Sequence, residues 1–585
     1  MFVDDIKLPN CNFGILIRSP SASGILKDIE CPHINSRYTL IRAKDIPGEN
    51  KLLGSEMPIL ADNELLYIGQ PCAILVGPDR LKLENYAADC KVIVEERTPV
   101  FFNQQYQPYE SNEPEIFEQK TIEFDNTIKK DEDESANFVV ECSYTTGIQE
   151  HWYSEAHGAA VSFQDGTITI HTASQWHDHV KESAAKVLGI PEYNITVEDA
   201  ELGTHLDGKI WFPSLVACQT ALAAFIAKKN VKIMFSRIDD FYYSPKRPKT
   251  ETHYKSVLDS TGTVLETDID IKFDMGAFGI FTDTILDDLC RSAYALYKLG
   301  KVRINAAAIK TNIPPAGPFD GFGASYGIFA LERHISKIAD TLHEDGALWR
   351  LEHLQNKKSI HSFPEELIEC VIGECDYRRK WGSYELLRRR EKKAGEKITP
   401  LRGIGISLGC SSTERVFTLN ERSEIALQNQ QEKEPVSACA VVEVEIDPVE
   451  YSANIRGIWI AVKTEYITDK IEMRYKIIRS LNTALGWASA EKINYIDGQL
   501  FYGITGEYDV PIVIQKLPIQ IEFIESSETV SGTIEEVPYG IFSAAYLQAV
   551  SQALNHAFNS IPISAFDIWQ IMNTRELEML GEKEA

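Results

Sequence analysis

Apolar and polar residues alternate along several short stretches near the start of the chain. Residues 13–18 show the alternation of a half-buried β-strand, and residues 66–77 combine a strand-like run with turn residues. Residues 81–90 have the pattern of a helix, and residues 91–96 return to that of a strand. The pattern therefore predicts a small mixed domain over residues 1–106.

The pattern changes after this first part. Residues 107–137 contain two prolines and a charged run without an apolar period, which predicts a linker. Strands and helices then follow one another, with a strongly apolar helix expected over residues 213–227 and a long strand over residues 264–278. A helix over residues 543–558 is expected near the end of the chain.

Prolines and glycines are concentrated over residues 311–327, where the interior of a helix or strand could not continue. Phe319 and Phe322 flank Gly321, and Gly323 follows. Glycine lets a backbone approach a ligand closely. Taken alone, the stretch is more typical of a proline-rich connector with an aromatic plug.

Composition narrows the possible functions. With 585 residues the chain predicts two to four domains, and its net charge of −27 argues against nucleic-acid or anionic-membrane binding. No apolar run is long enough to span a bilayer, and the N-terminus does not resemble a signal peptide. Eleven scattered cysteines without a Cys-x-x-Cys pair argue against a zinc or iron–sulfur site and predict reduced thiols in the cytoplasm.

No glycine-rich dinucleotide fingerprint follows a predicted strand, so we expect no flavin or nicotinamide site in this chain. If the protein is a redox enzyme, its electrons must leave through another chain.

Three motifs resemble one enzyme family. They are Tyr67-Ile-Gly-Gln-Pro-Cys-Ala, Gln149-Glu-His-Trp-Tyr-Ser-Glu and Phe319-Asp-Gly-Phe-Gly, which look like motifs of the molybdopterin-binding large subunit of xanthine dehydrogenases and aldehyde oxidases. The resemblance implies an α+β fold: a hammerhead-type domain over 1–106, then molybdopterin-binding domains with mixed sheets over 138–400 and, shortened, over 401–585.

The resemblance also assigns roles to single residues. It places Gln175 beside the molybdenum and implies that the cofactor lies against residues of two loops, Gly203, Gly208, Phe319, Asp320, Gly321 and Gly323. Phe319 and Phe322 would stack on a substrate ring, and Asp287 and Asp288 stand where relatives orient a purine. Glu536 aligns with the general base, and Glu535 replaces a glycine beside it; a solvated Glu-Glu turn is an equal alternative.

Several positions depart from the family pattern together. Thr204, His205 and Asp207 stand where the family has glycines, and Asp320 replaces an arginine. The chain also passes from Cys410 to a strand at residue 440 without the subdomain that holds the pterin phosphate in relatives. Two hypotheses follow from the resemblance and these departures.

The first hypothesis is a subunit of a molybdenum hydroxylase. It would use a molybdopterin–molybdenum cofactor to hydroxylate an aldehyde or N-heterocycle with oxygen from water. It would pass electrons to iron–sulfur and FAD-binding subunits, and could form a homodimer. The alternative is a cofactor-free relative that acts as a scaffold or binding subunit, or that was repurposed for a non-redox reaction.

Overall fold

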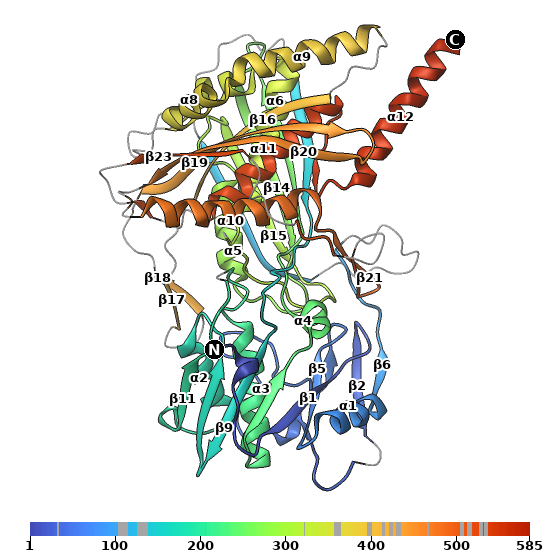
Figure 1. Cartoon of the computed structure of the whole chain (residues 1–585), viewed down its shortest axis with the longest axis vertical. Coiled ribbons are helices and arrows are strands. Elements are labelled where there is room, and N and C mark those ends of the chain that lie inside the picture. The colour runs from blue at the N-terminus through green and yellow to red at the C-terminus, as the bar shows by residue number, and fades with distance from the viewer. Residues whose placement is uncertain are drawn as a thin grey trace.

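The computed structural model has an α+β fold, as predicted, in which the N-terminal part and the C-terminal part form two lobes (Figure 1). It describes residues 1–31, 34–102, 115–125, 138–204, 206–320, 322–355, 364–394, 401–411, 416–419, 425–428, 434–464, 467, 469–502, 508–511, 518–525, 530–531 and 536–584.

A seven-stranded sheet forms the lobe that contains the N-terminus (Figure 1). Its strands, in spatial order, are β11 (Ile195–Asp199), β10 (Thr167–Thr172), β9 (Gly158–Gln164), β12 (Val231–Met234), β1 (Asn12–Arg18), β5 (Pro71–Gly77) and β3 (Thr39–Arg42). β1 pairs in parallel with β12, so that Asn12 lies opposite Val231. The predicted first domain therefore shares its sheet with residues beyond the predicted linker, and the domain boundaries themselves stay a prediction.

A smaller sheet and the helices α1 to α3 complete this lobe. The three-stranded sheet contains β4 (Glu64–Leu65), β2 (Gly24–Glu30) and β6 (Lys91–Glu96), beside α1 (Arg80–Asp89). Helices α2 (His177–Leu188) and α3 (Phe212–Ala227) pack against each other, and α3 lies on β9. α3 is apolar on all sides, as expected of a helix that is buried along most of its length.

A six-stranded sheet leads into the second lobe. Its order is β25 (Ser560–Ile561), β8 (Phe138–Thr146), β13 (Thr250–Leu258), β14 (Val264–Asp274), β15 (Lys301–Ile309) and β7 (Ile116–Asp125). Near it lie α4 (Arg237–Tyr243), α5 (Thr282–Ser292), α6 (Ala324–Leu342) and α7 (Gly346–His353). Helix α6 packs against β8 and β13, with α5 beside it.

The last sheet contains β16 (Leu401–Ser411), β19 (Glu434–Asp447), β20 (Ser452–Thr464) and β23 (Ile519–Glu525), with β24 (Val530–Ser531) paired to β19. Helix α11 (Val537–Leu554) is buried along its whole length and packs against this sheet and α6. A Cβ on Gly403 of β16 would lie 2.0 Å from Ala549 O, so this glycine permits the close approach of helix and strand.

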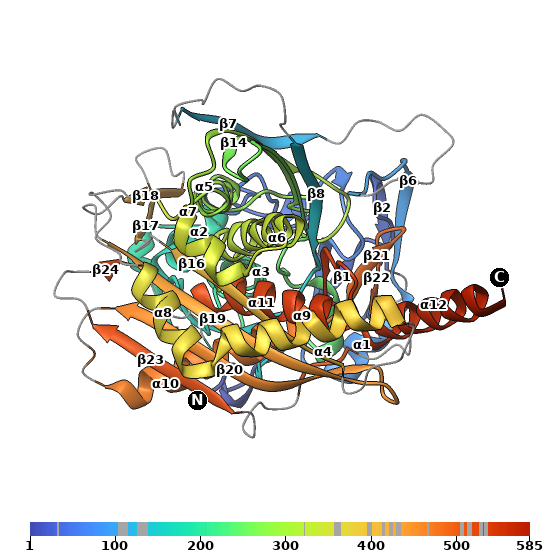
Figure 2. The same ribbon diagram turned by 90° about the horizontal axis from the view of Figure 1, so that it is seen from above.

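Further helices and two hairpins follow among the described residues. They are α8 (Pro364–Cys375), α9 (Tyr377–Ala394), α10 (Lys470–Ser489), α12 (Ala565–Glu584), and the hairpins β17 (Val416–Leu419) with β18 (Ile425–Gln428) and β21 (Ile493–Ile496) with β22 (Gln499–Tyr502). In both views α12 extends away from the body (Figures 1 and 2). Among the helices that the structure describes, none has the length and apolar character needed to cross a membrane.

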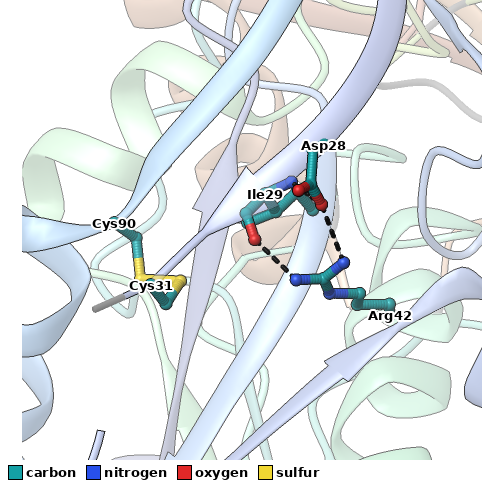
Figure 3. The surroundings of a disulfide bond; sticks show 5 residues. All are labelled: Asp28, Ile29, Cys31, Arg42 and Cys90. Atoms are coloured by element: carbon teal, nitrogen blue, oxygen red, sulfur yellow. Dashed lines mark hydrogen bonds and ion pairs between the residues drawn. A yellow bond between two sulfur atoms is a disulfide. The ribbon is translucent and has the colours of Figure 1, made fainter. Parts of the chain in front are cut away.

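The expectation that all thiols are reduced was wrong for one pair. Cys31, which follows β2, and Cys90, which caps the C-terminal end of α1, form a disulfide across a sequence separation of 59 residues (Figure 3). Nearby on β2, the Asp28 carboxylate binds the Arg42 guanidinium at 3.0 Å. Pairing of β2 with β6 brings the two cysteines together, which their wide spacing in the sequence did not indicate. The cytoplasmic location stays a prediction.

The start of the last predicted helix was also wrong. α11 begins at Val537, whereas the sequence predicted a start at residue 543. Pro538 lies in the first turn, where a missing N–H costs nothing. A Cβ on Gly540 would lie 2.7 Å from Ile328 of α6, so the glycine serves helix packing and does not mark a turn.

Candidate cofactor and active site

The loop before α6 packs on the imidazole of His151. His151 Nε2 donates to Pro318 O at 2.9 Å, and the ring stacks on Phe319 with the ring centres 4.5 Å apart. Burial lowers the pKa of His151 to about 3, so the ring is neutral. A Cβ on Gly208 would lie 2.6 Å from the same ring. The structure therefore brings two predicted cofactor positions, Gly208 and Phe319, together around His151.

The first turn of α11 joins two further predicted residues. The Tyr539 hydroxyl donates to Asp320 Oδ2 at 3.1 Å. Glu536 is the N-cap residue of the same helix and is only 4% exposed, so the solvated-turn alternative does not describe it. Its Oε2 accepts a hydrogen bond from Ser411 Oγ at 2.8 Å. Asp320 and Glu536 therefore both lie at the start of α11, and each has a protein partner.

Gln175 contacts the loop around Asp207, in which other residues replace the glycines of the family pattern. Its backbone N–H donates to Lys209 O at 2.9 Å, and its side-chain Nε2 donates to Asp207 Oδ1 at 3.2 Å. Asp207 has a φ of 64°, a left-handed conformation in which the family's glycine would be unstrained. The amide that the resemblance places beside the metal is thus hydrogen-bonded to a side chain that this chain has added.

The substrate-pocket residues are packed tightly. Phe322 makes an edge-to-face contact with Phe281, with the ring centres 5.9 Å apart. A Cβ on Gly323 would lie 2.0 Å from Ile285 O and 3.0 Å from the Cβ of Asp288. Asp288 is 6% exposed. These positions therefore form a packing contact between α5 and the start of α6.

Two predicted residues lie apart from the others. Asp287 is on the outer side of α5, where its 37% exposed carboxylate binds Lys120 of β7 at 2.5 Å. The backbone N–H of Gly203 donates to Glu155 Oε1 at 3.1 Å, and Lys209 binds the same oxygen at 2.7 Å. Gly203 therefore belongs to a local ion-pair cluster.

Gly321, Glu535 and His205 lie outside the described residues. Their roles stay as the resemblance implied them.

A buried arginine that the sequence did not single out lies at the centre of this region. The Arg247 guanidinium is 4.1 Å from the ring centre of Phe319, 4.2 Å from Trp487, 4.9 Å from Tyr539 and 5.7 Å from Tyr326. We call these five residues the Arg247 cage. No motif marks a single arginine between a lysine and a proline, so only the fold reveals it.

A polar network adjoins the cage. Glu491 is 3% exposed and accepts hydrogen bonds from the Tyr508 hydroxyl and from Gln149 Nε2, the latter at 3.2 Å. Gln149 also donates to Thr483 O at 2.9 Å, which links the family motif at residue 149 to α10. Burial raises the pKa of Glu491 to about 7, although Arg247 nearby favours the ionised form.

This raised pKa predicts a pH-dependent stability. Because the folded-state pKa of Glu491 exceeds its ordinary value of 4.5, its contribution is fully present below about pH 4.5 and is lost as the pH rises through about 7. We expect the wild type to lose about 3 kcal/mol relative to Glu491→Gln between these limits. Denaturant titrations of both proteins across this pH range measure the difference.

The exposed Glu472→Gln serves as the control, since that side chain is 66% exposed. It should follow the wild type at every pH. Parallel stability curves for wild type and Glu491→Gln would rule out the raised pKa.

The chain was compared with known proteins. Residues 109–354 match the model of a molybdopterin cofactor-binding domain. A probable xanthine dehydrogenase component of Bacillus subtilis (strain 168) is 25% identical over 369 residues, which are 61% of this chain and 49% of that protein. Over these residues the chain resembles xanthine dehydrogenases and aldehyde oxidases. It spans about half of that relative, and the match with aldehyde oxidase 3 of Rattus norvegicus covers 22% of that protein.

Solved structures confirm the fold. A Cu,Mo-CO dehydrogenase chain superposes with a TM-score of 0.83 at 14% identity, over 99% of this chain and 97% of that one. The aldehyde oxidoreductase of Desulfovibrio desulfuricans ATCC 27774 superposes with a TM-score of 0.79 at 16% identity, over 97% of this chain and 78% of that one. The chain therefore has the fold of molybdenum-hydroxylase large subunits.

The residues at the candidate site do not fit a molybdopterin cofactor. Ligands of such a size occupy cavities of about 300–1,000 Å³. Phe319, Asp320 and Glu536 are 1%, 6% and 4% exposed, and protein donors already serve both carboxylates. Four cavities lined by described residues, of about 340, 510, 510 and 450 Å³, contain no predicted site residue. We therefore derive no reaction step through the cofactor.

Proposed function

We propose that this protein is the large-subunit-type component of a molybdenum hydroxylase-type oxidoreductase. The complex would hydroxylate an aldehyde or an N-heterocycle with oxygen from water. One observation carries the proposal: the backbone follows a CO dehydrogenase chain over nearly the whole length of both. A structural match over so many residues favours a role that depends on the shape of the protein, such as assembly with other subunits.

The partners in this proposal are iron–sulfur and FAD-binding chains. The sequence has neither a Cys-x-x-Cys pair nor a glycine-rich dinucleotide fingerprint, so electron transfer would need other chains. The large-subunit fold could still serve in assembly with such chains, even though side chains fill the candidate site.

Affinity purification tests the assembly. The tagged chain, produced together with the proteins encoded next to it, is expected to elute with an iron–sulfur chain and a flavin-binding chain in equal amounts. Flavin and iron–sulfur absorbance in the eluted complex provides the readout. Elution of the chain without these partners, under conditions in which both are present and folded, would contradict the proposal.

A second candidate function is that this chain itself catalyses the hydroxylation, with Glu536 as general base. It is favoured by the burial of Glu536 at the start of α11, where Tyr539 of the same helix binds the predicted cofactor residue Asp320. The two candidates differ in whether molybdenum is bound to this chain, and the experiment of the next subsection separates them.

A further inference from the structure

We infer that this chain fills the cofactor position with its own side chains around Arg247 and does not itself bind a molybdopterin cofactor. This inference rests on the proposed function, and it concerns the same site. It makes the cage a permanent part of the folded core, so that the chain folds and assembles without a cofactor.

The Arg247 cage joins segments that are far apart in the sequence. Phe319 precedes α6, Tyr326 lies on α6, Trp487 on α10 and Tyr539 on α11. The backbone of Arg247 pairs with that of Gln149 in an isolated antiparallel β-bridge, and Arg247 precedes β13. One guanidinium therefore contacts both predicted molybdopterin-binding halves, at the junction where relatives would hold a cofactor between them.

Aromatic rings enclose the Arg247 guanidinium. Arg247 is 0% exposed, and the four rings are each 1% exposed or less. Its Nη2 is 3.5 Å from Asp320 O, whereas Nε and Nη1 have no hydrogen-bond acceptor in the described part of the chain. Aromatic faces attract a cation, and they surround these two groups here. The rings therefore offset part of the cost of burying this charge.

Aromatic contacts close the space between the helices. Tyr326 and Trp487 meet edge to face with ring centres 5.7 Å apart, and Phe319 and Tyr539 do so at 6.0 Å. The indole N–H of Trp487 donates to Gly147 O at 3.1 Å. Tyr326 stands where the family pattern has a glutamine, so a polar position has become part of an aromatic core.

Carboxylates lie beside the Arg247 guanidinium at this junction. Asp320 replaces an arginine of the family pattern, and its carboxylate lies beside Tyr539 in the cage. Glu536 lies one turn earlier on the same helix. A pterin phosphate would have to displace packed rings, and the Asp320 carboxylate already offsets part of the Arg247 charge that would attract it.

The test compares protein from two hosts, one that makes molybdopterin and one that cannot. The complex from the first host is dissociated, and molybdenum and released pterin are measured in the fraction that contains this chain. We expect neither, and we expect the same Tm for the chain from both hosts. About one molybdenum per chain, or a higher Tm from the molybdopterin-producing host, would overturn the inference.

A pair of variants probes the cage directly in cofactor-free protein. Arg247→Met should lower Tm by several degrees or yield insoluble protein, whereas Arg456→Met should not, because Arg456 is 51% exposed. An unchanged Tm for Arg247→Met would overturn the inference.

The outcomes distinguish this inference from the proposed function. Molybdenum on this chain in a complex with iron–sulfur and flavin partners would overturn only the inference. A molybdenum-free chain that binds no such partner would support the inference and overturn the proposed function.

Discussion

Replacing Arg350 with methionine should lower the free energy of unfolding by about 3–5 kcal/mol, because it leaves the buried Glu332 carboxylate without its cation. Both side chains are 0% exposed, and Arg350 Nη2 binds Glu332 Oε2 at 2.7 Å. Glu332 lies on α6 and Arg350 on α7, so the ion pair joins the two helices, and Arg350 also donates to Gly346 O at 2.9 Å within α7. Denaturant unfolding followed by tryptophan fluorescence would measure the loss.

The matched control is Arg379→Met. Arg379 forms an ion pair with Asp376 on the surface, where the two side chains are 71% and 55% exposed. Water already solvates both groups, so this change should cost less than about 1 kcal/mol. Equal effects of the two substitutions would show that the Arg350 pair is not buried as described.

Replacing Trp487 with alanine should cost about 3–5 kcal/mol, since a fully buried indole leaves a cavity that the surrounding helices cannot close. The change removes a wall of the Arg247 cage and the hydrogen bond to Gly147 O. The same unfolding measurement gives the size of the effect. The Tm of the variant shows whether it still folds cooperatively.

Trp569→Ala is the control for this prediction. Trp569 is 42% exposed on α12, where it stacks on Phe566. Its loss should change the stability by much less. A small effect of Trp487→Ala would mean that the cage is not a packed core, and it would reopen the question of a cofactor there.

Much of the fold was readable from local patterns. The helix expected over residues 213–227 is α3, because an uninterrupted apolar run can only be satisfied by burial. The start of α11 was missed because Pro538 and Gly540 also mark turns, and only packing against α6 shows why they suit a helix here. The shared seven-stranded sheet depends on a pairing between residues 12 and 231, which no local pattern encodes.

The candidate site was only partly readable. The resemblance identified Gly208, Phe319, Asp320 and Glu536, and the structure brings these into one region. It could not show that Asp287 pairs with a lysine 167 residues away.

The signal for the Arg247 cage is spread over five segments, and Phe319 is the only one of its residues that the sequence predicted as a site residue. Long-range contacts such as these, and the disulfide between Cys31 and Cys90, become visible only in three dimensions.

The central claim is that side chains occupy the cofactor position of a large-subunit fold. Anomalous diffraction at the molybdenum absorption edge tests it most directly, with crystals of the complex from a host that makes molybdopterin. We predict no anomalous peak between Phe319 and Glu536 of this chain, and density for the Tyr539 hydroxyl beside Asp320. A molybdenum peak at that position, with the rings of the cage displaced, would contradict the account.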